Sequence, residues 1–356
     1  MNRAKGQPKW RALAVACAVA LLAASCGSDS AADTQAAVEV SETVAAEPAA
    51  QVEEPEPDVA AVAEVEPEPT APPEPTPTPE PEPTPVPTPT AEPLPALEWA
   101  FDGLEPLGAA SVYEGWAIID GAPVSTGRFS LTDDGGVVAH TEPEVPGLPA
   151  ASAIVLTIEP AEGDDPAPSE VHVLAGDFVD GAAELTVSHP AAIGTDFATA
   201  GGVFILGTPT TAVTDDELSG VWFVNLSPTR AGLELPALGA GWTYEGWVVV
   251  DGIPVSTGRF SDPAMADDFN GLSGPDGTGP PFPGEDFIVN APEGLSFPTD
   301  LRNSTVVISV EPVPDDSPAP FAIKPLATIV PDGIGDHVLI TSTQGPPAPS
   351  GLAFIG

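Results

Sequence analysis

Cysteine and basic residues are scarce in this chain of 356 residues, and each shortage narrows what the protein can be. The only cysteines are Cys17 and Cys26, so a disulfide-rich scaffold or a zinc site built from several thiolates is excluded. Nine Lys and Arg residues stand against 53 Asp and Glu residues, a formal net charge of −44. Nucleic-acid binding and direct docking on an anionic membrane need basic patches, so both are disfavoured.

Catalytic signatures are missing as well. The sequence contains no hydrolase elbow, phosphate-binding loop, His-Glu-x-x-His pair or Cys-x-x-Cys pair. Its four histidines are scattered singly, and we expect them to be hydrogen-bonded or exposed turn residues. We therefore expect a protein that is not an enzyme and that holds no cofactor.

The N-terminus is predicted to be a lipoprotein signal peptide over residues 1–25. Four of the nine basic residues lie between Arg3 and Arg11, and the apolar run Ala12–Ala24 that follows is too short to span a bilayer. The small residues directly before Cys26 resemble the bacterial lipobox, in which the cysteine is acylated after cleavage. We therefore expect lipidation at Cys26 and an extracytoplasmic protein that meets the membrane through this anchor. An ordinary cleaved signal peptide is the alternative.

Residues 26–95 are predicted to be a lipid anchor followed by a disordered linker rich in Pro, Glu and Thr. Within it, residues 73–90 read PEPTPTPEPEPTPVPTPT. Alternating proline removes amide donors and fixes φ, so polyproline II is the expected conformation. At about 3.1 Å per residue, the segment would act as an extended stalk.

The folded part contains a duplication. Residues Tyr113 to Ser130 read YEGWAIIDGAPVSTGRFS, and residues Tyr244 to Ser261 read YEGWVVVDGIPVSTGRFS. Fourteen of the 18 positions are identical, and each difference exchanges one apolar residue for another. A repeat of this kind indicates two copies of one structural unit.

Each repeated peptide is predicted to be a β-hairpin. Asp120-Gly121 lies between two apolar runs, and Asp-Gly favours a type I′ turn because both central residues need positive φ. A two-residue turn places Ile118 opposite Pro123. A four-residue turn over residues 120–123 is the alternative, so the register stays open.

The two-residue turn makes two further predictions about facing side chains. Tyr113 would lie opposite Arg128, as a cation–π pair, and Trp116 would lie opposite Ser125. We interpret these residues and the turn as structural rather than catalytic. The corresponding residues of the second copy are Tyr244, Trp247, Asp251, Gly252 and Arg259.

A serine and a glutamate also recur in each hairpin. Ser125 and Ser256 are interpreted as strand or turn hydroxyls, because the repeat places no histidine near them. Glu114 and Glu245 are interpreted as strand carboxylates that pair with the nearby arginine.

The duplication continues beyond the hairpins. Residues 154–160 (IVLTIEP) match residues 306–312 (VVISVEP), an apolar strand that ends in Glu-Pro. Short runs rich in Val, Ile, Thr and Phe, punctuated by Gly and Pro, are typical of an all-β fold. We predict two tandem β-sandwich-like domains, over residues 96–227 and 228–356.

The second copy carries an insertion between these matched segments. It lies within Asp262 to Asn303, a region rich in Gly, Pro and Asp that is long enough to be functional or disordered. Its oxygen-bearing side chains are weak candidates for an irregular calcium site, because an EF-hand register would put Ala266 and Gly277 at ligand positions. The candidates are Asp267, Asp268, Asn270 and Asp276.

These motifs together resemble a known domain. Tyr-x-x-Trp, a turn, Pro-Val-Ser-x-Gly-x-Phe and then a strand ending in Glu-Pro are similar to the C-terminal, extracytoplasmic domain of RskA-type anti-sigma-K factors. The resemblance covers each copy and implies a β-sandwich-like sensor module outside the membrane. In that family a membrane helix connects the module to a cytoplasmic domain that holds a sigma factor. We identify neither segment here, so the resemblance implies the module and its location only.

Three functional hypotheses follow. The first is a non-enzymatic, membrane-anchored lipoprotein whose repeated domains bind or sense. The second is an accessory in envelope signalling that engages an anti-sigma sensor or another envelope protein. The third is an acidic surface protein that binds cations; a solubility or high-salt adaptation also accounts for the charge. The oligomeric state is left open.

Overall fold

A computed structural model describes residues 95–315 and 317–356, which belong to one compact unit. The predicted signal peptide, Cys26 and nearly all of the 26–95 linker lie outside these residues. The described residues are all-β, as predicted, and contain one 3₁₀ turn, η1 (Leu148–Ala150). None of their helices is long and apolar enough to cross a membrane.

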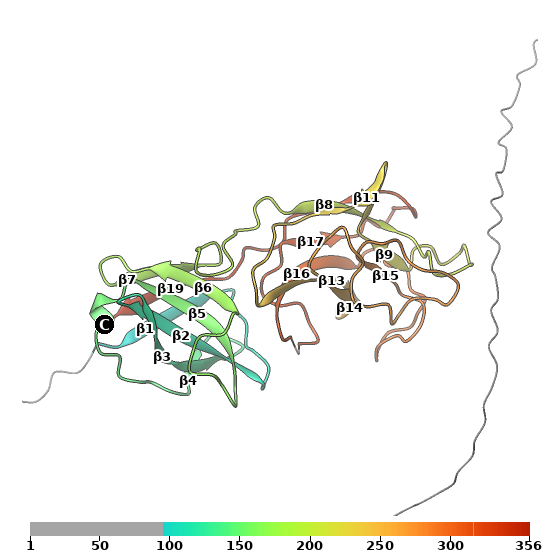
Figure 1. Ribbon diagram of the computed structural model, residues 1–356. Coiled ribbons are helices and arrows are strands. Elements are labelled where there is room, and N and C mark those ends of the chain that lie inside the picture. Colours follow the sequence, from blue (N-terminus) through green and yellow to red (C-terminus); the bar gives the residue numbers. More distant parts are fainter. Residues whose placement is uncertain (1–94, 316) are drawn as a thin grey trace, which may run out of the picture. The chain divides into compact units, whose positions relative to one another are not determined.

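The first hairpin lies in an eight-stranded antiparallel sheet (Figure 1). Its strands follow the spatial order β1-β19-β7-β6-β5-β2-β3-β4. Their bounds are β1 Leu97–Asp102, β2 Ser111–Ile119, β3 Ala122–Leu131, β4 Val137–Ala139, β5 Ala153–Pro160, β6 His172–Asp177, β7 Ala182–Thr186 and β19 Ser350–Ile355.

The second hairpin lies in a four-stranded sheet of order β14-β13-β16-β17, which repeats the order β3-β2-β5-β6 of the first. A five-stranded sheet has the order β12-β8-β9-β15, with β18 also paired to β8, and β10 and β11 form a ribbon. The bounds are β8 Gly201–Leu206, β9 Gly220–Trp222, β10 Val224–Leu226, β11 Thr229–Ala231, β12 Leu233–Glu234, β13 Trp242–Val250, β14 Ile253–Phe260, β15 Gly284–Asp286, β16 Thr305–Pro312, β17 Leu326–Ile329 and β18 Ile340–Thr341.

The turn of each hairpin has two residues, as the Asp-Gly pair predicts. Asp120 and Gly121 have φ values of 51° and 80°, the positive pair that a type I′ turn requires. Ile118 lies opposite Pro123 in this register. The alternative four-residue turn is therefore wrong.

A β-bulge changes the register further from the turn. Trp116 faces Ser125, but Gly115 faces Gly127, so Thr126 is an extra residue on the return strand. Beyond the bulge Glu114 faces Arg128. The predicted pairing of Tyr113 with Arg128 is therefore wrong, because a simple two-residue hairpin has no bulge.

Tyr113 instead packs into the core. It faces Phe129, and the two rings stack with centroids 5.8 Å apart. Its hydroxyl donates to the carbonyl of Glu105 at 2.7 Å. In the second hairpin Tyr244 stacks on Phe260 at the same distance, and the bulged residue is Thr257.

The strand pairing crosses the domain boundary expected after residue 227. Strand β8, from the first expected domain, pairs with β12 and β18 of the second. Strand β19, from the second, lies between β1 and β7 of the first sheet. The repeated motifs locate equivalent strands, but they contain no information about which distant strand completes each sheet.

The insertion within Asp262–Asn303 is partly built into the fold. Its strand β15 pairs with β9, and Phe287 and Leu301 are fully buried. These contacts hold the insertion against the five-stranded sheet, beside the second hairpin.

We predict that Gly127→Ala destabilises the protein by about 1–3 kcal/mol. Gly127 has φ of 116°, and an added Cβ would lie 2.2 Å from the carbonyl oxygen of Thr141. The urea midpoint measures the loss. Gly239→Ala is the control, because a Cβ added there would have no atom within 4 Å; equal losses in both variants would contradict a required bulge.

Candidate functional site

A buried carboxylate lies beside the bulge of the first hairpin. Glu114, on β2, is 4% exposed, and its Oε1 accepts a hydrogen bond from Ser125 at 2.5 Å. Its Oε2 lies 3.4 Å from Nε of Arg128. The bulge places the arginine here, because it brings Arg128 directly opposite Glu114.

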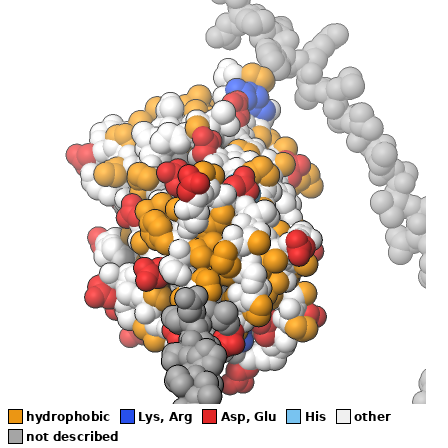
Figure 2. Space-filling view, turned by 90° about the vertical axis from the view of Figure 1, so that its left-hand side faces the viewer, with side chains coloured by type: hydrophobic (Ala, Val, Ile, Leu, Met, Phe, Trp, Pro, Cys, Tyr) orange, Lys and Arg blue, Asp and Glu red, His pale blue; other side chains and the backbone are white. Residues whose placement is uncertain are grey.

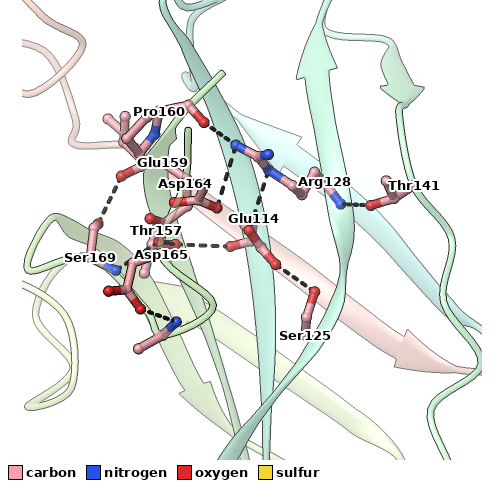
Figure 3. Close-up of polar contacts among 12 residues, drawn as sticks. Glu114, Ser125, Arg128, Thr141, Thr157, Glu159, Pro160, Asp164, Asp165 and Ser169 are labelled. Atoms are coloured by element: carbon pink, nitrogen blue, oxygen red, sulfur yellow. Dashed lines mark hydrogen bonds and ion pairs between the residues drawn. The ribbon is translucent and has the colours of Figure 1, made fainter. Parts of the chain in front are cut away.

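The guanidinium of Arg128 spans three oxygen-bearing groups (Figure 3). Besides Glu114, it lies 3.6 Å from Oδ2 of Asp164 and donates to the carbonyl of Pro160. We call the set Glu114, Ser125, Arg128 and Asp164 the first acidic notch. Two carboxylates and one carbonyl therefore hold a single internal cation.

A second polar chain connects the hairpin with β5. Trp116 donates from Nε1 to Oγ1 of Thr157 at 2.9 Å, and Thr157 donates to the carboxylate of Glu159. The same carboxylate accepts the amide of Ser169 at 2.9 Å. Because Thr157 and Glu159 are almost fully buried, the chain satisfies polar groups that would otherwise be costly to bury.

The second copy repeats this chain with different side chains. Trp247 donates to Ser309 at 2.9 Å, Ser309 donates to Glu311, and Glu311 accepts the amide of Phe321 at 3.0 Å. Ser256 donates to Glu245 at 2.5 Å, as Ser125 does to Glu114. The polar groups are thus repeated along with the hairpin.

The two copies differ in the group with which the arginine of the hairpin pairs. Arg259 faces Glu245 across the strands, but its Nε lies 3.5 Å from Oδ2 of Asp268, and its side chain is 43% exposed. Arg128 is 21% exposed. We call the set Glu245, Ser256, Asp268 and Asp315 the second acidic notch.

One position explains the different direction of the arginine. In the first copy the amide of Arg128 donates to Oγ1 of Thr141 at 2.9 Å. In the second copy the amide of Arg259 donates to Oδ1 of Asp268 at 2.8 Å. Asp268 therefore occupies the place of Thr141, and its second oxygen adds a charge that attracts the guanidinium.

The buried glutamate of each notch has a raised pKa. Burial raises the pKa of Glu114, while the hydrogen bond from Ser125 and the charge of Arg128 oppose the rise. Burial raises the pKa of Glu245 to about 7, and Asp315 and Asp268 add to the rise. Burial also raises the pKa of Glu311 and of Glu285 to about 7.

The sequence predicted some of these residues. It identified the recurrent Glu114 and Glu245 and their serines, and the pairing of Glu114 with an arginine is confirmed. The expected pairing of Glu245 with Arg259 is wrong, because Arg259 pairs with Asp268 instead. It missed the roles of Glu159 and Glu311, although the Glu-Pro that recurs at these positions was visible. The sequence did not show that Asp268 of the second copy takes the place of Thr141 of the first, because the segments that contain the two residues do not align.

The histidines contact nearby polar groups of the described residues. His140 lies 2.7 Å from the hydroxyl of Ser130, and His172 lies 2.9 Å from the carbonyl of Ala191. His189 pairs with Asp177 at 3.5 Å.

Three of the four calcium candidates, Asp267, Asp268 and Asn270, line one pocket, and Asp276 is not among its lining residues. Asp267 accepts the amides of Phe269 and Gly284 at 3.0 and 2.7 Å, and burial raises its pKa to about 6. Asp268 holds Arg259, whereas Asn270 and Asp276 are exposed.

Three metal-ligating side chains do come together elsewhere. Ligand atoms of Glu217, Asp336 and His337 lie within 4.8 Å of one another, a grouping found once among the described residues. His337 and Asp336 pair at 3.0 Å, and Glu217 accepts the amide of Thr208 at 3.0 Å. Because Asp336 and His337 are exposed, this group is a surface cluster with local partners.

We predict that Arg128→Gln costs more stability than Arg259→Gln. Removing Arg128 leaves the buried Glu114 without its cation, at a cost of about 2–4 kcal/mol. Arg259 pairs on the surface, where a loss below about 1 kcal/mol is expected. Urea unfolding of both variants measures the difference; equal losses would contradict the distinct positions of the two side chains.

We predict that stability falls as the pH rises from about 4.5 to about 7. Glu245, Glu285 and Glu311 each have a folded-state pKa of about 7, against an ordinary value of 4.5. The folded state therefore binds protons more tightly than the unfolded state. Ionisation of each group lowers the free energy of unfolding by about 1–3 kcal/mol across this pH window.

Thermal melts at pH 5 and pH 8 check this dependence. Glu311→Gln should reduce the difference between the two melting temperatures, because the amide does not titrate. Glu184→Gln, at an exposed position on β7, should leave the difference unchanged. An identical pH dependence of wild type and Glu311→Gln would refute the assignment to Glu311.

Comparison with known proteins gives one match. A family model described as "Anti-sigma-K factor rskA, C-terminal" matches residues 12–172, which is less than half of the chain and includes the first hairpin but not the second. No curated protein and no solved structure matches the chain. The chain therefore carries, within residues 12–172, a domain like the C-terminal domain of anti-sigma-K factor RskA.

Proposed function

We propose that the protein is a non-enzymatic lipoprotein that presents RskA-like binding domains on the extracytoplasmic side of a bacterial membrane. The match of residues 12–172 to the RskA C-terminal family carries this proposal. Cys26 would hold the acyl anchor, and the Pro-rich segment would act as the stalk. The second β unit would be a further copy of the same module.

The polar network supports a structural use of the recurring side chains. Ser125 and Ser256 donate to buried carboxylates and accept the amides of Gly127 and Gly258, so each hydroxyl connects the bulge to the neighbouring strand. Glu159 and Glu311 accept backbone amides. These contacts are those of groups that hold strands and turns together.

The same family match favours a second candidate function. A module similar to an anti-sigma-factor domain can take part in envelope signalling, as an accessory that engages an anti-sigma sensor or another envelope protein. This candidate differs from the first in its partner, not in its anchor or fold.

We predict that Cys26→Ala abolishes acylation and releases the protein from membranes. The thiol of Cys26 is the proposed acceptor of the lipid, so a clickable fatty acid should label wild type and not the variant. Cys17→Ala is the matched control and should keep the label, because Cys17 lies inside the apolar run. Label retained in Cys26→Ala would refute the anchor.

A further inference from the structure

The second acidic notch differs from the first in the partner of its arginine, because Arg259 pairs with Asp268 at 3.5 Å rather than with Glu245. Glu245 is 6% exposed; Ser256 donates to its Oε1, and no donor among the described residues contacts its Oε2. The equivalent oxygen of Glu114 lies against Arg128. Oε2 of Glu114 therefore has a cationic group 3.4 Å away, and Oε2 of Glu245 has no ion-pair partner among the described residues.

A cavity of about 330 Å³ lies at this position. Both carboxylates that flank Glu245, those of Asp268 and Asp315, line it, together with the hydroxyl-bearing Ser256 and Ser317. Its lining is mainly polar and acidic, and only Arg259 contributes a positive charge. The cavity is thus suited to a cation.

The first copy shows what kind of cation fits these groups. There a planar guanidinium reaches Glu114, Asp164 and the carbonyl of Pro160 at the same time. In the second copy Glu245 and Asp315 are the counterparts of Glu114 and Asp164. A guanidinium has several donors in a fixed fork and suits two separated carboxylates better than a point charge does.

A compact metal ion fits less well. The carboxylates of Glu245, Asp268 and Asp315 do not form a group of three with ligand atoms within 4.8 Å, whereas such a group exists among other described residues. Calcium needs six to eight oxygens at about 2.3–2.6 Å, so these groups would have to move together to bind it.

We propose that the second acidic notch binds an arginine side chain of a partner protein, with Glu245 and Asp315 holding the guanidinium as Glu114 and Asp164 hold that of Arg128. This inference rests on the proposed binding function and names the chemistry of its partner. Asp268 keeps Glu245 and Asp315 available, because it pairs with Arg259 at the edge of the cavity. Acidic side chains are spread over the surface shown in Figure 2, where basic ones are few, so a basic partner would also be attracted at long range.

The test uses the purified full chain and a small probe, N-acetyl-arginine amide, at 150 mM NaCl to screen non-specific attraction. Amide NMR shifts of Glu245, Ser256 and Gly258 should change with the probe and saturate. N-acetyl-lysine amide should bind at least about threefold more weakly. Equal binding of both probes, or shifts only with CaCl₂, would overturn the assignment to arginine.

Four variants separate the site from general charge. Glu245→Gln should weaken probe binding at least tenfold, whereas the matched Glu114→Gln in the occupied notch should leave it unchanged. Arg259→Gln should strengthen binding severalfold, because it removes the internal competitor. Asp268→Thr gives the second copy the residue type that the first copy has at the equivalent place, Thr141. It should weaken binding, because Arg259 can then pair with Glu245.

A double variant decides the role of Arg259. If Arg259 blocks the site in Asp268→Thr, then Asp268→Thr combined with Arg259→Gln should recover binding. Failure to recover would refute the competition, and unchanged binding in Glu245→Gln would refute the site. These outcomes are independent of acylation at Cys26, so loss of the anchor and loss of the arginine site are distinguishable results.

Discussion

One extra residue in the return strand of each hairpin determines which side chains face each other. Thr126 and Thr257 are the bulged residues, and the glycines after them accept a φ of 116° and 112°. Without the bulge, arginine would face tyrosine over the core. With it, tyrosine stacks on phenylalanine inside, while arginine lies opposite a buried glutamate. Both the aromatic core and the acidic notch depend on this one-residue shift.

The buried polar groups connect strands that are far apart in the chain. Trp116 and Thr157 are separated by 41 residues, and Trp247 and Ser309 by 62. In each copy the chain of hydrogen bonds ends on a backbone amide in the turn after the Glu-Pro strand. Threonine and serine are exchanged between the copies without loss of the bond, since either hydroxyl can accept from the indole and donate to the carboxylate. The fold thus preserves the bonding pattern rather than each residue.

The local features of this fold were predictable from sequence, and the distant ones were not. Asp-Gly predicted a type I′ turn, and the runs ending at Pro160 and Pro312 predicted β5 and β16, because both signals lie within a few residues. The bulge was missed because a single glycine within a strand is a weak signal. The contrast between Thr141 and Asp268 was missed because only the folded chain brings each residue to the amide of its arginine. The position of β19 was missed because pairing between strands so far apart in the sequence leaves no local pattern.

The place of β19 has a consequence for synthesis and folding. Leu97 pairs with Ile355, so β1 cannot join the eight-stranded sheet until β19 has been synthesised. While the ribosome still holds residues 350–355, β1 and β7 have no strand between them, and two rows of amide and carbonyl groups are open to water or to another chain. Closure of the sheet is therefore a late, long-range event of the kind that slows folding. Until residues 350–355 are in place, one edge of β1 and one edge of β7 stay unpaired, and removal of these residues would separate β1 from the other strands of the sheet.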